Sequence, residues 1–264
     1  MARISVLMGV YNCAAYLQQA LDSLYAQTCQ DFKIILCDDG SSDDTYAIAG
    51  ENAAVHSNIV LLQNDKNLGL NATLNRCLEY ADTEFCARMD GDDISLPARF
   101  EAELKFLDGH PQYAIVSTPM HYFDQGDIFC TGKGGGEPSI KDFPKGTPFC
   151  HAPCMVRTEA YKAVGGYSVS DKLLRVEDYH LWIKMYAKGY RGYMLDEPLY
   201  MMRDDRSALH RRNLRSRLNE ARVKAIAIRT FRLPVWEYIY CLKPVILGLM
   251  PAGLYSRLRK AANG

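Results

Sequence analysis

The amino-acid sequence predicts an α/β protein whose mainly parallel central sheet is flanked by helices. Apolar runs of strand length alternate with segments of helical periodicity through the first hundred residues, and parallel strands need such helical crossovers. Polar or flexible residues also follow every expected strand of this half. Because ligands of such sheets bind beyond the carboxyl ends of the strands, these residues predict a functional site at that edge.

The expected elements follow one another in a regular order. An apolar run at 4–8 predicts the first strand, and Leu17, Leu21 and Leu24 predict a helix over 15–27. The same criteria predict strands at 32–37, 59–62 and 84–89, a helix opened by the cap-forming residues 41–44, and a helix over 70–80. Beyond Pro97 we expect a helix through 107, a strand over 113–120, a hairpin with a mobile, substrate-covering loop over the glycine-rich residues 126–146, and a helix from about 177.

Length and composition indicate a cytoplasmic globular protein. A chain of 264 residues with 48% hydrophobic content can bury a sizeable core. Its nine cysteines are odd in number, and several fall within apolar patterns, as buried thiols do in a reducing cytosol. The amino-terminal residues lack the pattern of a secretion signal. The late apolar stretches at 235–242 and 244–255 fall short of the roughly 20 residues that span a bilayer.

Charge is unevenly distributed, although the formal net charge is zero. Residues 203–264 contain 14 Lys and Arg against four Asp and Glu, which predicts a separate role for this part of the chain. We therefore expect a main domain at 1–203 and a basic amphipathic helical tail at 204–264.

The tail is expected to consist of amphipathic helices. The helix at 211–232 carries arginines on one side and apolar residues on the other, namely Leu214, Leu218, Ala221, Ala225 and Ile228. An apolar, aromatic stretch follows from 235 and ends in basic residues. This composition suits peripheral contact with an anionic membrane and disfavours nucleic acid. A helical cap on the core and a docking site for a protein partner remain alternatives.

Three carboxylates follow the fourth expected strand, in the run Asp90-Gly91-Asp92-Asp93. Carboxylates packed this closely repel one another, and a hard divalent cation such as Mg²⁺ or Mn²⁺ relieves that repulsion. A second acidic turn, Asp38-Asp39-Gly40, follows the second strand. Alone it is typical of a turn and helix cap. Two acidic strand ends at one edge favour instead a site for a cation and a diphosphate.

Six motifs, in order, resemble the inverting glycosyltransferases of family 2, which have the nucleotide-binding GT-A fold. They are Ser5–Asn12, Asp38–Asp43, Asn67–Gly69 with Leu74-Asn75, Asp90–Asp93, Gly165–Tyr167 and Glu177-Asp178. The resemblance covers about residues 3–203 and implies a GT-A nucleotide-diphospho-sugar transferase fold with a C-terminal helical extension. The tail resembles that of bacterial exopolysaccharide and capsule glycosyltransferases, which implies a position on the inner face of the cytoplasmic membrane and a glycan or polyprenyl-linked acceptor.

On the donor side, the resemblance implies that the nucleotide sugar, usually a uridine derivative, contacts Gly9, Tyr11, Asp39, Asn67 and Asp90. Asp92 would bind Mn²⁺ or Mg²⁺, with Asp93 in support. The chemistry agrees, because a carboxylate accepts from a ring N–H of the base and a tyrosine face stacks on it.

On the acceptor side, Asp178 matches the family's catalytic base and Glu177 precedes it. A sugar hydroxyl is a poor nucleophile, so a positioned carboxylate is needed to take its proton. The cation would neutralise the leaving diphosphate. The pair also has a plainer explanation, as a complement to the helix dipole. His151 falls where relatives often have a His before small residues, and we expect it either on the acceptor side or packed in the core.

The sequence departs from the commonest family pattern after Tyr200. Many relatives have a His a few residues beyond this strand, which serves the metal or the diphosphate, whereas here Arg203 follows first and His210 later. Metal ligation by His210 is therefore an open alternative. Arg203 is expected to counter the diphosphate charge or to belong to a solvated basic face.

The combined prediction is a metal-dependent inverting hexosyl- or N-acetylhexosaminyltransferase. It would move a sugar from a UDP-sugar to a glycan or lipid-linked acceptor in the synthesis of exopolysaccharide, capsule or lipopolysaccharide. The alternative is a GT-A domain that acts mainly as a regulatory protein-binding module through its tail. A dinucleotide oxidoreductase is disfavoured, because Gly9-Val-Tyr-Asn follows the first strand in place of G-x-G-x-x-G.

Overall fold

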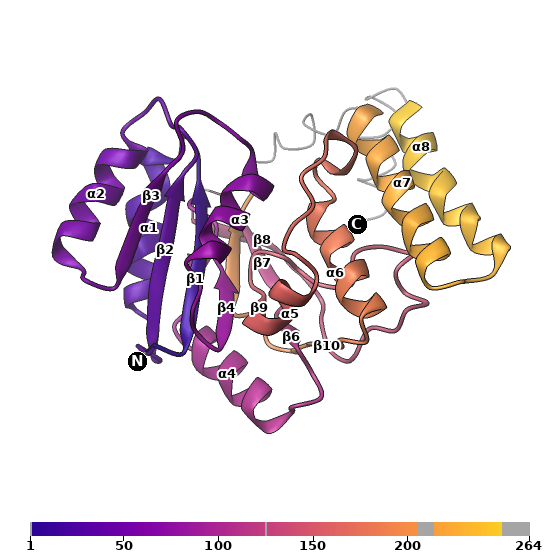
Figure 1. Ribbon diagram of the computed structural model, residues 1–264, viewed down its shortest axis with the longest axis horizontal. Coiled ribbons are helices and arrows are strands. Elements are labelled where there is room, and N and C mark those ends of the chain that lie inside the picture. The colour runs from indigo at the N-terminus through magenta and orange to yellow at the C-terminus, as the bar shows by residue number, and fades with distance from the viewer. Residues whose placement is uncertain (1, 125, 205–213, 250–264) are drawn as a thin grey trace.

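A seven-stranded sheet forms the centre of the protein in a computed structural model that describes residues 2–124, 126–204 and 214–249 (Figure 1). The strand order is β10-β6-β9-β4-β1-β2-β3. The strands are β1 (Ile4–Val10), β2 (Phe32–Asp38), β3 (Ile59–Gln63), β4 (Phe85–Arg88), β6 (Ile115–Ser117), β9 (Met155–Arg157) and β10 (Gly192–Met194). Only β9 pairs antiparallel with its neighbours, β4 and β6. The expected mainly parallel sheet is therefore confirmed, with β9 as an unpredicted insertion.

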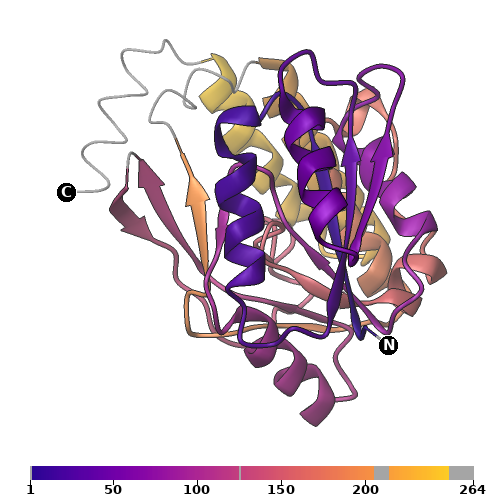
Figure 2. The ribbon, with the colours of Figure 1, turned by 90° about the vertical axis from the view of Figure 1, so that its left-hand side faces the viewer.

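Helices cover both faces of this sheet (Figure 2). On one face, α1 (Ala14–Tyr25), α2 (Thr45–Val55) and α4 (Arg99–Gly109) pack with Ile4, Val6 and Met8 of β1. On the other face, α3 (Leu70–Glu79), α5 (Thr158–Ala163) and α6 (Glu177–Ala187) pack with Leu7. Because successive strand residues point to opposite faces, the apolar runs seen in the sequence fill both layers. The elements expected over the first ninety residues are all present, with ends shifted by a few positions.

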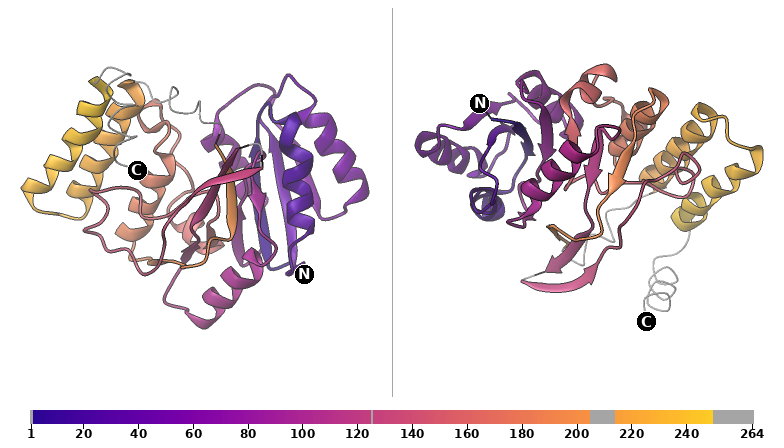
Figure 3. Two further views of the ribbon diagram at one scale, coloured as in Figure 1. Left: turned by 180° about the vertical axis from the view of Figure 1, so that it is seen from behind. Right: turned by 90° about the horizontal axis from the view of Figure 1, so that it is seen from below.

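A second sheet of four strands, in the order β5-β11-β7-β8, lies beside the first (Figure 3). Its strands are β5 (Ile94–Ser95), β7 (Met120–Asp124), β8 (Asp127–Thr131) and β11 (Tyr200–Arg203). The single strand expected over 113–120 is wrong: β6 belongs to the large sheet and β7 to the small one. The break falls at Thr118-Pro119, where proline lacks the N–H that a ladder needs. The small sheet joins the acidic run before β5 to residues 200–203.

The expected hairpin is present as β7 and β8, which pair antiparallel, and part of the glycine-rich segment that follows pairs with the edge of the large sheet. The backbone N–H of Gly136 donates to the carbonyl of Met194 at 3.0 Å, and the return bond is 2.9 Å. A side chain at Gly134 would collide with the carbonyl of Leu195, so the absence of Cβ there permits this close approach. The segment then continues to Phe143 and Phe149, which are buried in the core. It is therefore fixed by pairing and packing on both sides.

The expected C-terminal helices are present, and their packing differs between them. Helix α7 (Leu214–Thr230) contributes Val223 and Ala227 to the core cluster around α6, whereas Leu214 and Leu218 are each 44% exposed. The 3₁₀ turn at Val235–Tyr238 leads into α8 (Ile239–Leu249), which lies against α7 (Figure 1). In the described ranges, no helix has the length and apolar character needed to cross a bilayer.

Candidate active site

The turn after β1 is hydrogen-bonded to the turn after β2. The N–H of Asn12, which has a left-handed φ of 49°, donates to Ser41 Oγ at 2.9 Å, and Asn12 Oδ1 accepts from the N–H of Ser42 at 2.9 Å. The neighbouring Tyr11 is exposed. A Cβ at Gly9 would lie 3.2 Å from Thr73 Cγ2, so glycine lets α3 pack closely on β1. Tyr11 therefore presents its ring beside two turns that fix each other.

Asp39 is buried behind these turns, and the loop 64–69 wraps around it. Asp39 Oδ1 accepts from Asn64 Nδ2 at 2.7 Å and from the N–H of Leu68 at 2.9 Å, and Oδ2 accepts from the N–H of Gly69 at 2.9 Å. Asn67 Oδ1 also accepts from the N–H of Gly69, at 3.1 Å. Since a carboxylate has about four acceptor positions, Oδ2 retains the capacity for one further N–H. The predicted residues Asp39 and Asn67 thus belong to one loop cluster.

The first carboxylate of the acidic run is paired with an arginine. The guanidinium of the buried Arg88, at the end of β4, donates to Asp90 at 3.2 and 2.5 Å, while its Nε lies buried without a hydrogen-bond partner. A Cβ at Gly91 would lie 2.8 Å from Cys13 Sγ, so the run packs directly against the start of α1. Arg88 therefore neutralises part of the repulsion expected within the acidic run.

Arg203 fixes the other two members of the acidic run. Its backbone N–H donates to Asp93 Oδ1 at 2.8 Å, and its Nε donates to the backbone carbonyl of Asp92 at 2.9 Å. The guanidinium lies over the rings of Tyr16 and Phe123, at 4.2 and 4.5 Å from their centroids. Asp93 is buried, and burial followed by the charge of Asp90 raises its pKa well above the usual range. Arg203 thus holds the loop backbone.

The carboxyl group of Asp92, in contrast, reaches solvent. Surrounding protein atoms and the charge of Asp90 raise its pKa. Within residues 2–124, 126–204 and 214–249, no three His, Cys, Asp or Glu side chains converge to hold a metal by themselves. Mg²⁺ and similar ions at nucleotide sites are commonly held by one or two carboxylates together with phosphates and water. One solvent-facing carboxylate, beside one paired with Arg88 and one buried, fits that kind of site.

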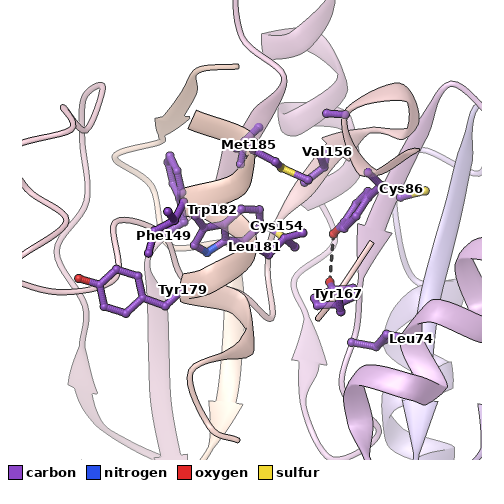
Figure 4. Close-up of a cluster of buried hydrophobic side chains, with 14 of the residues drawn as sticks. Leu74, Cys86, Phe149, Cys154, Val156, Tyr167, Tyr179, Leu181, Trp182 and Met185 are labelled. Atoms are coloured by element: carbon purple, nitrogen blue, oxygen red, sulfur yellow. Dashed lines mark hydrogen bonds between the residues drawn. The ribbon is translucent and has the colours of Figure 1, made fainter. Parts of the chain in front are cut away.

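His151 lies in an aromatic layer next to α6. Its Nε2 is 2.8 Å from the hydroxyl of Tyr167, which is 3.1 Å from that of Tyr161, and its ring packs edge-on against Trp182. Figure 4 shows Trp182 and Leu181 of α6 pointing into this cluster, with Tyr167 hydrogen-bonded at its other side. Burial, and then the charge of Arg88, lowers the pKa of His151 well below its usual range, which keeps the ring neutral.

An asparagine from α3 holds the Gly165-Gly166-Tyr167 turn. Asn75 Nδ2 donates to the carbonyl of Tyr167 at 2.8 Å, and Asn75 Oδ1 accepts its N–H at 2.7 Å. Both glycines have positive φ. The motif residues Asn75 and Gly165–Tyr167, almost a hundred positions apart, therefore form one structural unit that places Tyr167 beside His151.

Asp178 lies in the first turn of α6, next to Glu177. Burial, and then the negative charge of Glu177, raises the pKa of Asp178 to about 6. Arg88 acts in the opposite direction, so the guanidinium that pairs with Asp90 is also within electrostatic reach of Asp178. Glu177 Oε2 is buried without a hydrogen-bond partner. A carboxyl group with a pKa near neutrality suits a general base.

The sequence interpretation missed Arg88. A charged residue inside the apolar run Phe85–Met89 was the available signal, because a buried guanidinium needs a partner.

His210 lies outside the described residues. Two surface cavities, of about 330 and about 270 Å³, lie away from these residues. The larger is lined by Thr83, Glu84, Arg157, Thr158, Glu159 and Lys162.

Comparison with known sequences identifies the family. The model of "Glycosyl transferase family 2" matches residues 5–165, a range that ends before Asp178. A Bacillus subtilis (strain 168) protein named glycosyltransferase EpsE is 39% identical over 259 residues, which are 98% of this chain and 93% of that one. An Escherichia coli protein named UDP-Glc:alpha-D-GlcNAc-diphosphoundecaprenol beta-1,3-glucosyltransferase WfaP is 26% identical over 73% of each chain.

Solved structures identify the fold. TarS of S. aureus in complex with UDP-GlcNAc superposes with a TM-score of 0.69 at 19% identity, covering 94% of this chain and 72% of that one. The mannosyltransferase PcManGT of Pyrobaculum calidifontis, in complex with GDP-Man and Mn²⁺, gives 0.68 at 19% identity, covering 99% and 79%. Both are GT-A glycosyltransferases. The matched family model, the similarity to EpsE and this fold together show that the chain belongs to glycosyltransferase family 2 and has the GT-A fold.

Proposed function

We propose that this chain transfers a sugar from a UDP-sugar, with Mn²⁺ or Mg²⁺, to a glycan or polyprenyl-linked acceptor, with inversion at the anomeric carbon. The observation that carries the proposal is that three neighbouring carboxylates have different surroundings. Arg88 pairs with Asp90 and the backbone of Arg203 with Asp93, which leaves Asp92 facing solvent. Such an arrangement suits a metal-diphosphate complex better than a structural turn.

On the donor side, the remaining acceptor position of Asp39 would take a ring N–H of the base, and the exposed ring of Tyr11 would stack on it. Asn67 shapes the loop around Asp39, and Asp90 would face the ribose. Uridine is the favoured nucleoside because WfaP is named for UDP-Glc and TarS was solved with UDP-GlcNAc. PcManGT, solved with GDP-Man, gives the contrasting case that a donor screen must include.

Asp92 is the residue that would hold the cation, with Asp93 in support of the loop. When bound, the cation would supply charge neutralisation of the departing diphosphate. Arg203 fixes the loop through the Asp92 carbonyl, and its positive charge lies at the same edge. We therefore assign Arg203 first to positioning the loop and second to the electrostatics of the diphosphate.

Asp178 would act as the base. The acceptor oxygen forms a bond to the anomeric carbon as the bond to the diphosphate breaks, the diphosphate leaves with the electron pair, and the acceptor proton moves to Asp178. A single displacement of this kind inverts the configuration. His151, held neutral against Tyr167, would line the acceptor side next to Trp182, while Glu177 supports Asp178 by raising its pKa.

We further propose that the enzyme is cytoplasmic and contacts the anionic inner face of the cytoplasmic membrane through what we call the α8 apolar face. This face consists of the exposed side chains Val235, Trp236, Ile239, Leu242, Ile246 and Leu249. At about 100° per residue the four α8 members share one side of the helix, and the exposed Lys243 borders it. A lipid-linked acceptor, as in the name of WfaP, would be met at such a surface.

A metal-dependent donor screen tests the transferase proposal. UDP-glucose, UDP-GlcNAc, UDP-galactose and GDP-mannose are compared by calorimetry and by release of nucleoside diphosphate, with Mn²⁺, with Mg²⁺ and with EDTA. We expect tight binding of a UDP-sugar only with a cation. Failure of every UDP-sugar to bind with either metal would refute the donor assignment. Failure of GDP-mannose as well would favour the protein-binding alternative.

A further inference from the structure

Helix α7 holds the segment that leads into α6. Asn219, only 2% exposed, donates from Nδ2 to the carbonyls of Asp171 and Leu174, at 3.1 and 3.2 Å. Arg222 Nη1 donates to the carbonyl of Lys172 at 3.3 Å, and Arg215 forms an ion pair with the Asp171 side chain at 2.9 Å. Three polar side chains of one helix therefore converge on the four-residue segment 171–174.

The turn that follows this segment is strained. Arg175 has a φ of 67°, a left-handed conformation that is rare for a residue with a Cβ. Such conformations persist only when the surrounding structure holds them. Val176, the next residue, is buried in the core cluster that also contains Val223 of α7, and Glu177 begins α6. The position of Asp178 is thus set three residues after a strained turn that α7 holds from outside.

The same helix holds a second loop beside α6. Lys224, also 2% exposed, donates to the carbonyls of Pro144 and Lys145, each at 2.9 Å. The neighbouring Phe143 packs edge-on against Tyr186 of α6 and against Phe231, at 4.9 and 5.0 Å between ring centroids. Burying an ammonium group costs free energy unless it is hydrogen-bonded. The ammonium group of Lys224 has these hydrogen bonds, and its burial indicates that α7 holds the loops around α6.

We propose that α7 is a positioning element of the catalytic centre, in which Asn219 holds the strained turn at Arg175 and thereby the location of Asp178. This proposal rests on the proposed function, because it takes Asp178 as the base. It assigns to the tail a role in turnover that is separate from membrane contact. Asn219 acts through the turn and touches no substrate.

The proposal predicts an altered pH profile when the turn is loosened. Among the described residues, the titratable and charged groups that act on or are acted on by Asp178 are Glu177 and Tyr179 on α6, Arg88 on β4, Cys150 and Tyr167. None of them lies on α7. Loosening the turn at Arg175 would expose the partly buried Asp178 further to water, so its pKa would fall towards the ordinary value of an aspartate.

The test compares Asn219→Ala with Asn58→Ala in the full chain. Asn58 also donates from its side-chain amide to a backbone carbonyl, in this case the single carbonyl of Phe32, at the far edge of the sheet. The readouts are Mn²⁺-dependent hydrolysis of UDP-GlcNAc and UDP-glucose as a function of pH, and calorimetric binding of UDP with Mn²⁺. For Asn219→Ala we expect kcat to fall about 10- to 100-fold, because misplacing a catalytic group by about 1 Å lowers the rate by about that factor. The affinity for UDP should stay unchanged, and the acidic limb of the pH profile of kcat should move to lower pH. Asn58→Ala should leave kcat, UDP affinity and the pH profile unchanged.

A rescue variant separates positioning from general destabilisation. Arg175→Gly removes the cost of the left-handed turn, so adding it to Asn219→Ala should restore part of the lost kcat and return the acidic limb. If Asn219→Ala does not fold, Arg222→Ala is used, which removes the hydrogen bonds to the Lys172 carbonyl and to Asn219 Oδ1. An unchanged kcat and pH profile then overturns the proposal. It is equally overturned if Asn219→Ala keeps the parental kcat, or loses UDP affinity in parallel. Activity that survives Asp178→Asn would instead refute the base assignment, and this inference with it.

Discussion

The proposed donor side and the proposed acceptor side of this site differ in the surroundings of their ionisable groups. On the donor side, carboxylates at the ends of β2 and β4 already have partners: Asp39 accepts three N–H groups and Asp90 pairs with Arg88. On the proposed acceptor side, His151 packs against Tyr167 and Trp182, and burial opposes the charged form of both His151 and Asp178. The contrast indicates that one side is arranged to bind charge and the other to keep a proton acceptor near neutrality.

The largest expected effect comes from Asp178→Asn. Loss of the base should lower kcat by about 10²- to 10⁴-fold, while UDP binding with Mn²⁺ stays at the parental level, because the donor side is intact. Single-turnover kinetics and calorimetry measure the two quantities. A matched control is Asp127→Asn, which changes the same charge on the exposed strand β8. A parallel loss of UDP affinity would show that the two sides are not separable.

The complementary change is Asp92→Asn. Removing the solvent-facing carboxylate should weaken Mn²⁺-dependent UDP binding by about 10- to 100-fold, and binding measured in EDTA should be unaffected. Because Arg203 Nε donates to the backbone carbonyl of Asp92 and not to its carboxylate, the fold should be kept. Calorimetry with and without metal measures this difference. If Asp92→Asn binds UDP with Mn²⁺ as the parent does, the cation is held elsewhere.

The pH dependence of kcat/KM sharpens the contrast further. Transfer should rise with pH through about 6, as Asp178 loses its proton, and then level off. Because its pKa is raised on folding, the native state binds this proton more tightly than the unfolded chain does, so the contribution to stability is present at low pH and lost as pH rises through about 6. Asp178→Asn should therefore be more stable than the parent at pH 8, by about 1–3 kcal/mol.

Thermal melts of Asp178→Asn and the parent between pH 4 and pH 8 check this prediction. Their difference should shrink towards pH 4. Equal stability at both pH values would mean that Asp178 is not desolvated, and a pH-independent kcat/KM would remove it as the base.

The smallest effect on chemistry, and the largest on location, is expected at the α8 apolar face. Of the two tryptophans, Trp236 is 71% exposed and Trp182 is buried. Vesicles rich in phosphatidylglycerol should shift the emission of Trp236 to the blue and carry the protein into the pellet, an effect lost at high salt. Ile239→Glu with Leu242→Glu should abolish co-sedimentation without changing UDP-sugar hydrolysis. Unchanged co-sedimentation would indicate that this face meets a protein partner or that other residues bind the membrane.

Much of the donor side was predictable because its signals are local. Strands β1 to β4 are apolar runs followed directly by polar turns, so the carboxyl edge and its residues follow from the pattern. The three-residue strand β9 and the two-residue strand β5 were not predictable, since so few residues carry no periodicity. Arg88 was visible as a charge in an apolar run, but its pairing with Asp90 depends on a turn geometry that the sequence does not specify.

The tail shows why composition alone misleads. Of the predicted apolar side, Leu214 and Leu218 are exposed and Ile228 is buried, and the buried residues of α7 also include Asn219 and Lys224. Those polar residues are buried because carbonyls some 45 to 80 positions away accept their hydrogen bonds. Such partners cannot be inferred from a helical pattern. The prediction of a helical cap on the core therefore holds for α7, and the surface-anchor prediction stays open for α8.

The pairing of β5 with β11 has a consequence for the order in which the site forms during synthesis. Arg203 is made 110 positions after Asp93, yet its backbone N–H and its side chain hold Asp93 and the carbonyl of Asp92. On the ribosome, the turns after β1, β2 and β4 can assemble early from neighbouring sequence, but the acidic run lacks its last restraint until residue 203 has emerged. A nascent or truncated chain that ends near residue 165, where the family match ends, would keep the turns after β1, β2 and β4 and still hold Asp92, the proposed metal ligand, loosely.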